Sequence, residues 1–264
     1  MIEIIDLVKT FHRGSVNEVL ALSGINLNMR KGEFITIIGS NGAGKSTLLN
    51  CLAGSIAIDS GHVSIDEQDV TRWPEYQRAH LISRVFQDPL LGTCGPLSIE
   101  QNLALANRRG KIHGLDKGVR RSDRELFRKQ LSQLGLGLET RLKDRVGLLS
   151  GGQRQALTLL MATLIKPKIL LLDEHTAALD PKTAQQVLGL TQQLINNQQL
   201  TALMVTHNMR QALQLGNRLI MLHGGRVILD LSEKEKKKMK VDDLLEQFYK
   251  VRGEEFVSDR MLLV

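Results

Sequence analysis

The fold is decided by one stretch, Gly39-Ser40-Asn41-Gly42-Ala43-Gly44-Lys45-Ser46-Thr47. This stretch matches G-x-x-x-x-G-K-[ST], the pattern of a phosphate-binding loop. An apolar, β-branched run at 34–38 precedes it and predicts a buried strand, whereas the run at 48–53, closed by Gly54, predicts a helix. The loop therefore lies between a strand and a helix, which is the context that the motif requires. The alternative is a glycine-rich turn that opens an ordinary helix.

The residue types in this loop suit a nucleotide with a bound metal ion. Its glycines allow backbone N–H groups to turn toward one anion at the positive end of a helix. Lys45 is expected on the β- and γ-phosphates, and the Ser46 hydroxyl is expected on Mg²⁺. A phosphate-bearing nucleotide and Mg²⁺ are the ligands that this pattern predicts.

Composition limits the remaining choices. The 264 residues suffice for one large α/β domain or two small ones, and the net charge of +7 fits nucleic acid, an anionic membrane surface or an anionic ligand. Cys51 and Cys94 form no C-x-x-C pair, so we expect two small buried hydrophobic residues in a reducing compartment. No uncharged run approaches the roughly 18 residues of a membrane span, which predicts a chain that is neither secreted nor membrane-spanning by itself.

Apolar runs along the chain predict an α/β fold with a helical block inside it. The segment 24–29 alternates as an antiparallel strand with one solvent-exposed face would, and capping-box patterns open helical runs at Ser98, Ser122 and Ser150. Strands separated by helices then return after about residue 165, which favours a mostly parallel sheet covered on both faces. Residues 218–230 predict a hairpin. The charged run 233–240 predicts a solvated linker or helix face before a short terminal helix.

Two acids follow the apolar strand pattern at 169–172. Asp173 and Glu174 would stand at the carboxyl end of a buried strand, where ligands of open α/β sheets bind. Asp173 is a candidate ligand of the Mg²⁺ coordination shell. Glu174 comes next in sequence and so points in a different direction from Asp173, which suits a base that polarises an attacking water. The alternative is that these acids cap the next helix.

The run Leu149-Ser150-Gly151-Gly152-Gln153 alone could be a plain helix start with a capping box. Together with the loop at 39–47 upstream and Asp173-Glu174 downstream, it resembles the ATP-binding cassette (ABC) family. The resemblance covers about residues 1–232 and implies a P-loop NTPase with a RecA-like core, an antiparallel β subdomain and an inserted helical signature subdomain at about 89–162. Residues 233–264 remain as a basic linker and a short C-terminal helical extension.

The resemblance also implies roles for four further residues. Phe11 occupies the place of an aromatic that stacks on adenine, with a core phenylalanine as the alternative. Gln87 matches a glutamine that touches Mg²⁺ and senses a transmembrane partner, and His207 matches a histidine that contacts the γ-phosphate. Asp180 matches a loop that crosses a dimer interface, although an Asp before Pro181 is also a good helix N-cap.

In this family two cassettes pair head to tail, so each ATP lies between the phosphate loop of one copy and the Ser150–Gln153 turn of the other. The implied partners are transmembrane permease subunits and an extracytoplasmic solute-binding lipoprotein, with the cassettes cytoplasmic and peripheral on the inner face of the cell membrane. Nucleic acid is not expected as a partner. The implied enzyme is an ATPase that drives transport.

The sequence departs from the usual family pattern at Ala156 and Met161, where arginines are common, and at His175, where proline is common. With residues 87–93, these departures resemble bacterial import cassettes linked to lipoprotein receptors for tryptophan or tyrosine. The first hypothesis is therefore the ATPase subunit of a bacterial importer of a small solute such as an amino acid. The alternatives are a soluble ATP switch that binds nucleic acid or the ribosome, and the cassette of an exporter.

Overall fold

The computed structural model describes residues 1–110 and 118–252. The chain forms two compact units. The first unit joins Met1–Arg78 to the chain from Thr201 onward, and the second unit is Ala79–Leu200. Each unit has its own strands and its own hydrophobic core.

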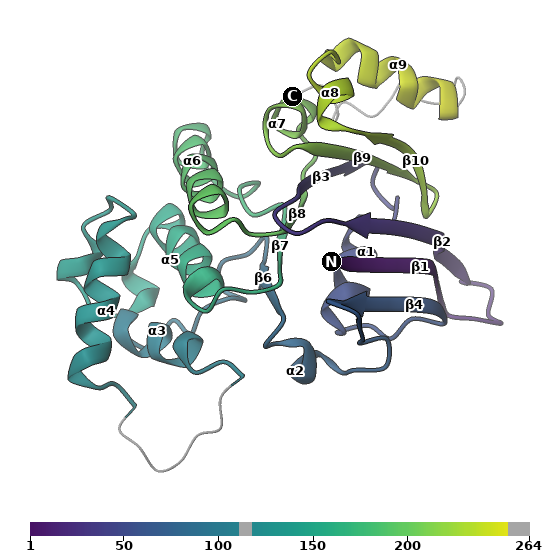
Figure 1. The fold of residues 1–264 in the computed structure, drawn as a ribbon. Helices are drawn as coiled ribbons and strands as arrows, with labels where there is room; N and C mark the ends of the chain where they lie inside the picture. Colours follow the sequence, from purple (N-terminus) through teal and green to yellow (C-terminus); the bar gives the residue numbers. More distant parts are fainter. Residues whose placement is uncertain (111–117, 253–264) are drawn as a thin grey trace. The chain divides into compact units, whose positions relative to one another are not determined.

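One sheet of the first unit is antiparallel. Strand β1 (Ile2–Phe11) pairs with β2 (Val19–Met29) on one side and with β4 (Ser60–Ile65) on the other, and β5 (Gln68–Asp69) adds to β4 (Figure 1). Buried and exposed residues alternate along 25–29 of β2, because successive side chains point to opposite faces of a sheet. The predicted antiparallel strand with one wet face is confirmed.

The other strands of the first unit surround β3 (Phe34–Gly39), whose six residues are all buried. Strands β8 (Ala202–Val205) and β9 (Arg218–His223) pair with it in parallel, and β10 (Arg226–Leu231) closes the predicted hairpin with β9. Because β3 and β8 run parallel, their carboxyl ends meet at one edge. Helix α1 (Lys45–Ala53) follows β3 there, and α7 (Met209–Gln214) follows β8.

The C-terminal segment packs on this unit as two helices. Helices α8 (Glu233–Lys236) and α9 (Val241–Arg252) lie beside the β9–β10 hairpin (Figure 1). Leu244 and Phe248 are fully buried in a cluster that includes residues of β3, α7 and β9. The prediction of a solvated charged run fails at Lys236, which is only 4% exposed. Its ammonium can be buried because it donates hydrogen bonds to the backbone carbonyls of Leu215 and Gly216 at the end of α7.

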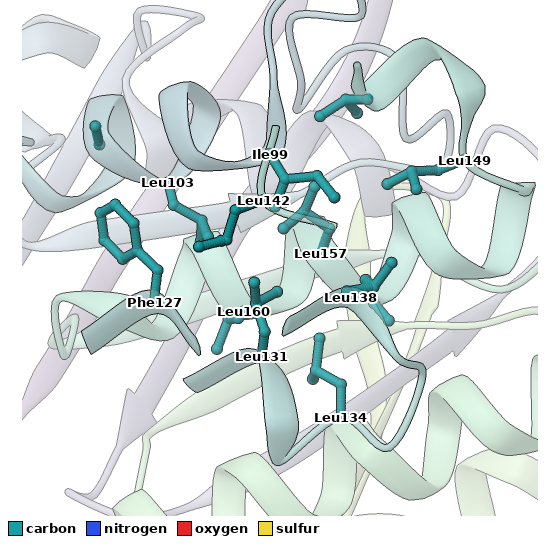
Figure 2. Close-up of a cluster of buried hydrophobic side chains, with 13 residues drawn as sticks. Ile99, Leu103, Phe127, Leu131, Leu134, Leu138, Leu142, Leu149, Leu157 and Leu160 are labelled. Atoms are coloured by element: carbon teal, nitrogen blue, oxygen red, sulfur yellow. The ribbon is translucent and has the colours of Figure 1, made fainter. Parts of the chain in front are cut away.

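The second unit holds two parallel strands and a helical block. Strand β6 (Ile82–Val85) pairs with β7 (Ile169–Asp173). The helices are α3 (Ile99–Asn107), α4 (Arg121–Ser132), α5 (Gly151–Leu164) and α6 (Pro181–Gln198). Side chains of α3, α4 and α5 form one apolar cluster around Leu103, Phe127 and Leu157 (Figure 2). Together the two units confirm the predicted α/β class.

The short elements complete the description. Helix α2 (Glu75–Arg78) belongs to the first unit, and the 3₁₀ turns η1 (Leu138–Thr140) and η2 (Val146–Leu148) belong to the second. In the described part of the chain, no helix combines the length and the apolar character needed to cross a bilayer.

The two cysteines differ from each other. Cys51 is fully buried in α1, as predicted, and burial raises the pKa of its thiol to about 11. Cys94 is exposed, so the prediction of a buried hydrophobic residue is wrong there. It lies in the loop before α3, where its backbone bonds to the Asn102 amide instead of its side chain packing in a core.

Candidate functional site

The phosphate loop of the first unit connects β3 directly to α1. Gly44 has a φ of 97°, and a Cβ there would stand 2.5 Å from the Ala21 carbonyl oxygen of β2. Gly39 has a φ of 156°, and its Cβ would stand 2.3 Å from the Leu222 carbonyl oxygen of β9. Both positions therefore require glycine, because a side chain would collide with backbone and also strain the turn. Backbone carbonyls of β2 and β9 thus leave no room for a side chain at these two positions of the loop.

Lys45 is held inside this loop. Its side chain is buried, and Nζ donates to the carbonyl oxygens of Gly39 at 2.8 Å and Ser40 at 2.9 Å. It is also the first residue of α1, where Gly44 offers no side chain to cap the helix and no acid occupies the first turn. The first N–H groups of a helix lack intrahelical partners and attract anions. A cation and a helix N-terminus therefore converge on one place, beside the exposed Ser46.

The structure places the remaining loop residues around this point. Asn41 and Gly42 are exposed, Ala43 is buried, and Thr47 is half-buried in the first turn of α1. The Ala43 carbonyl accepts the Gly225 N–H from the turn of the β9–β10 hairpin at 3.2 Å. The loop is thus supported from β2, β9 and the hairpin turn.

His207 stands at the same edge of the first unit. It follows β8, and the preceding Thr206 N–H donates to the Ile37 carbonyl of β3 at 3.1 Å. The His207 side chain is half-buried, and Asn208 caps α7 directly after it by accepting from the Gln211 N–H. The parallel register of β3 and β8 thus brings the carboxyl ends that carry Gly39 and His207 next to each other.

Phe11 ends β1 opposite Val19 of β2. Its ring is half-buried instead of lying in a core, so the alternative reading as a core phenylalanine is wrong. The Lys9 ammonium lies 5.6 Å from the ring centroid, and Val19 and Leu20 beside it are about half exposed. Ala21, two residues after Val19 in β2, touches the phosphate loop at Gly44. The strand pair that supports this loop therefore also carries the aromatic ring of Phe11.

The carboxylates belong to the second unit. Asp173 ends β7, and its Oδ2 accepts from Arg84 Nη2 of β6 at 2.7 Å. Because β6 and β7 pair in parallel, Gln87 leaves β6 at the edge where Asp173 and Glu174 leave β7. Gln87 is exposed, whereas Asp173 and Glu174 are half-buried. Glu174 has a φ of 45°, a left-handed conformation that is strained for a residue with a side chain.

The turn at Ser150–Gln153 opens α5. Ser150 accepts from the Gln153 N–H at 3.2 Å, and the Gln153 side chain accepts from the Ser150 N–H, so the predicted capping box is confirmed. Ser150 and Gly151 are exposed, whereas Gly152 is buried. A Cβ on Gly152 would stand 2.1 Å from Thr183 Cγ2 in the first turn of α6. The second glycine of this motif is therefore needed for helix packing within the same unit.

Asp180 begins α6. Its carboxylate accepts from the Thr183 N–H at 3.1 Å, and the hydrogen bonds with Thr183 lower the pKa of the exposed Asp180 carboxyl. The predicted N-cap is therefore present, with Pro181 at the first helical position. Gly151 lies against Leu179, so the segment before α6 and the start of α5 are neighbours.

The departures from the family pattern fit the interior of the second unit. Ala156 is fully buried in the apolar cluster, and Met161 packs against that cluster. An arginine at position 156 would bury a charge there. His175 is 2% exposed, with Nε2 2.9 Å from Thr191 Oγ1 of α6. Burial lowers the pKa of His175 to about 4, so its ring is neutral at neutral pH.

Sequence reasoning missed several supporting residues. Gln155 Nε2 donates to the Phe86 carbonyl just before Gln87, at 3.2 Å. The Arg154 guanidinium donates to three carbonyls of the turn before Ser150, those of Val146, Gly147 and Leu149. Arg84 holds Asp173 and stacks its guanidinium 4.7 Å from the Phe86 ring centroid. The only sign of these residues in the sequence is that they stand beside the motifs, because their hydrogen-bond partners lie on other elements.

Comparison with known proteins gives four further findings. A family model described as ABC transporter matches residues 22–177. A tyrosine transport ATP-binding protein of Clostridioides difficile (strain R20291) is 46% identical over 94% of this chain and 98% of its own length. A thiamine import ATP-binding protein, ThiQ of Yersinia pseudotuberculosis serotype I (strain IP32953), is 38% identical over 78% of this chain and 82% of its own. The ATP-binding cassette MJ0796, solved as a dimer in a post-hydrolysis state with ADP and Pi, has a TM-score of 0.75 at 29% identity, covering 88% of this chain and 99% of that one.

Proposed function

The chain belongs to the ABC transporter family of ATP-binding subunits, and we propose that it powers a bacterial importer whose cargo is an amino acid with an aromatic side chain. The family makes it an ATP-hydrolysing enzyme with a P-loop NTPase fold, so the predictions of family, fold and enzyme class are confirmed. The observation that carries the cargo proposal is the nearly full-length similarity to the tyrosine transport protein.

The nucleotide would bind to the first unit. Backbone N–H groups of Gly42–Thr47 and the Lys45 ammonium would hold the phosphates, because this loop offers buried positive charge and backbone donors, and the first turn of α1 carries no acidic residue. We propose that Phe11 stacks on adenine and that His207 contacts the γ-phosphate from the neighbouring strand end. The glycine-only loop fits a phosphate group, since a Cβ at Gly39 or Gly44 would meet backbone.

Mg²⁺ would be held mainly by oxygen ligands and by the nucleotide. We propose Ser46, Gln87 and Asp173 as the protein groups for Mg²⁺, which prefers oxygen ligands and usually retains water and substrate phosphates. Among the described residues, no cluster of three or more His, Cys, Asp and Glu side chains is placed to hold a metal alone. The bound ion supplies charge neutralisation at the β- and γ-phosphates.

Glu174 is proposed as the base for the attacking water. It follows Asp173 at a strand end, is accessible, and is held in a strained backbone conformation of the kind that concentrates at functional sites. The Glu174 carboxylate would orient the water and accept its proton while Lys45 stabilises the charge on the phosphates. Loss of such a base typically reduces turnover by about 10²- to 10⁴-fold.

A second copy would complete each site. The Ser150–Gln153 turn offers an exposed serine and the positive N-terminal end of α5, and we propose that it binds the γ-phosphate held by another copy. Asp180 would lie at that interface. MJ0796 was solved as a dimer with hydrolysis products, which supports a homodimer of cassettes for this chain.

The remaining partners follow from the proposed transport role. We propose transmembrane permease subunits and an extracytoplasmic solute-binding lipoprotein, with this chain peripheral on the cytoplasmic face of the membrane. We also propose residues 1–232 as the ATP-binding domain, with a helical subdomain at about 89–162, and 233–264 as its extension. Relatives named for import or transport favour this function over a nucleic-acid switch or an exporter cassette.

Two experiments test this function separately. ATP binding to the purified chain is measured by calorimetry for the wild type and Lys45→Ala, and equal affinities would refute the phosphate-loop assignment. Uptake of labelled tyrosine, tryptophan, thiamine and methionine is measured in cells lacking this gene and complemented with either form. Wild-type rescue of aromatic amino acid uptake alone is expected, with no rescue by Lys45→Ala. Rescue of only thiamine or methionine uptake would refute the cargo while leaving the ATPase intact.

A further inference from the structure

The strained backbone at Glu174 needs support from its surroundings. A left-handed conformation is unfavourable for a glutamate, so nearby contacts must hold it. One contact is local, since the Glu174 carbonyl accepts the Ala177 N–H at 2.9 Å and closes a turn over 174–177. A further contact comes from His175, which anchors this turn to a helix.

The hydrogen bonds at Thr191 determine which nitrogen of His175 carries the proton. Thr191 Oγ1 is 2.8 Å from the Val187 carbonyl one helical turn earlier, and that carbonyl can only accept. The hydroxyl therefore donates its single hydrogen to Val187 and accepts from His175 Nε2, 2.9 Å away. His175 Nδ1 then bears no hydrogen, and it has no hydrogen-bond partner among the described residues. The chain N–H···O–H···O=C fixes the direction of the ring.

The helix that receives this bond also touches the signature turn. Thr191 lies in the third turn of α6, and Thr183 in the first turn packs against Gly152 of α5. The same helix thus supports the turn that carries Glu174 and the start of α5 within the second unit. Thr191 is 1% exposed, so water does not compete for its hydroxyl.

We propose that His175 is a positioning residue for Glu174: its Nε2–H bond to Thr191 ties the 174–177 turn to α6 and sets the direction of the Glu174 carboxylate. This inference rests on the proposed role of Glu174 as the base. The His175–Thr191 bond joins two residues of the second unit, whereas the phosphate loop and Lys45 belong to the first unit, so its loss should affect turnover and spare nucleotide affinity. Small errors in the placement of a catalytic group are costly, since about 1 Å can reduce a rate by about 10²-fold.

Matched variants on both sides of the bond test this proposal. His175→Leu removes the donor, and His175→Gln keeps an N–H near the position of Nε2. Thr191→Val removes the acceptor, and Thr191→Ser keeps it. For each purified full-length chain, kcat and KM with Mg-ATP, ATP affinity by calorimetry and the thermal midpoint are measured.

We expect His175→Leu and Thr191→Val each to reduce kcat about tenfold or more, with ATP affinity within about twofold of the wild type. His175→Gln and Thr191→Ser should retain most of the turnover. The double variant His175→Leu/Thr191→Val should lose no more than either single one, because both remove the same bond. Unchanged kcat in either single variant would overturn the proposal, and so would a loss of ATP affinity as large as the loss of kcat.

The same substitution in a chain that already carries Glu174→Gln distinguishes a positioning role of His175 from a general loss of structure. In Glu174→Gln, where the base is already absent, His175→Leu should cause no further loss of the residual rate. An equal loss in both backgrounds would show that His175 acts independently of Glu174 and would overturn the inference. If His175→Leu does not fold, Thr191→Val against Thr191→Ser decides by the same criteria. Wild-type turnover in Glu174→Gln would instead refute the proposed base, and so the proposed mechanism itself.

Discussion

Lys236 gives the sharpest stability prediction, because a buried ammonium must titrate abnormally. Its Nζ donates to the carbonyl oxygens of Leu215 and Gly216 at the end of α7, and it lies 3.4 Å from Thr36 Oγ1 of β3. Burial lowers the pKa of Lys236 from 10.5 to about 8, with partial compensation from Glu233. Between these two values the unfolded chain still binds a proton that the folded chain has released.

The free energy of unfolding therefore rises with pH across this window. The lysine's contribution is fully present above the unfolded pKa and is lost as the pH falls through the folded one. At about 1.36 kcal/mol per pKa unit, the shift corresponds to roughly 3 kcal/mol. Most of this gain should be present by about pH 10, before the lysine of the unfolded chain has titrated fully.

The assay is urea unfolding of the wild type and Lys236→Met at several values from about pH 7 to about pH 10.5. The difference in the free energy of unfolding, wild type minus variant, should increase by about 2–3 kcal/mol over this range. Lys237→Met is the matched control, because the Lys237 side chain is largely exposed and its ammonium pairs with Glu233 of α8. If the free energy of unfolding changed with pH in the same way for the wild type and Lys236→Met, the lowered pKa of Lys236 would be refuted.

Three further predictions concern the proposed site. Gly152→Ala should destabilise the chain by about 1–3 kcal/mol in urea unfolding, because its Cβ would collide with Thr183. Gly151→Ala is the control and should be tolerated, because its Cβ would stand 3.4 Å from Leu179. Equal losses of stability in the two variants would contradict the packing argument. Phe11→Ala should weaken ATP binding about 5- to 100-fold and leave binding of inorganic triphosphate unchanged, since only adenine would stack, and calorimetry that finds both ligands equally weakened would exclude stacking. Asp173→Asn should raise the Mg²⁺ concentration for half-maximal ATPase activity and spare metal-free ATP binding, and an unchanged Mg²⁺ titration would remove Asp173 from the metal site.

The parts of the site that the sequence predicts well are local ones. The loop at 39–47 could be placed between a strand and a helix because glycine, lysine and flanking apolar runs are adjacent in the chain. The capping boxes at Ser98 and Ser150 involve residues three positions apart, and both exist as predicted. The prediction of a helix start at Ser122 is wrong, because Arg120 is the N-cap and its N–H donates to the Asp123 carboxylate. Short-range hydrogen bonds of this kind depend little on the rest of the fold.

The supporting contacts could not be predicted, because their partners are distant in sequence. His175 was recognised as an unusual residue, but nothing in the sequence indicated that Thr191, on the next helix, would bond to its ring. Arg84 and Asp173 lie 89 positions apart and meet only through the parallel register of β6 and β7. A residue's neighbours across a sheet depend on strand order and register, which a single sequence does not specify.

Lys236 shows how an average property of a segment can mislead. A run of charges predicts solvent exposure for the segment as a whole, but a helical turn still turns one side inward. The inward residues here are Lys236 and, three positions later, Met239, which packs against the cluster around Phe248. Met239 was the one apolar residue of the run, and it marked the buried side. A long lysine stem on that side can cover apolar surface while its ammonium donates to the carbonyls of Leu215 and Gly216 at the end of α7, so the charge serves as a helix cap in the interior.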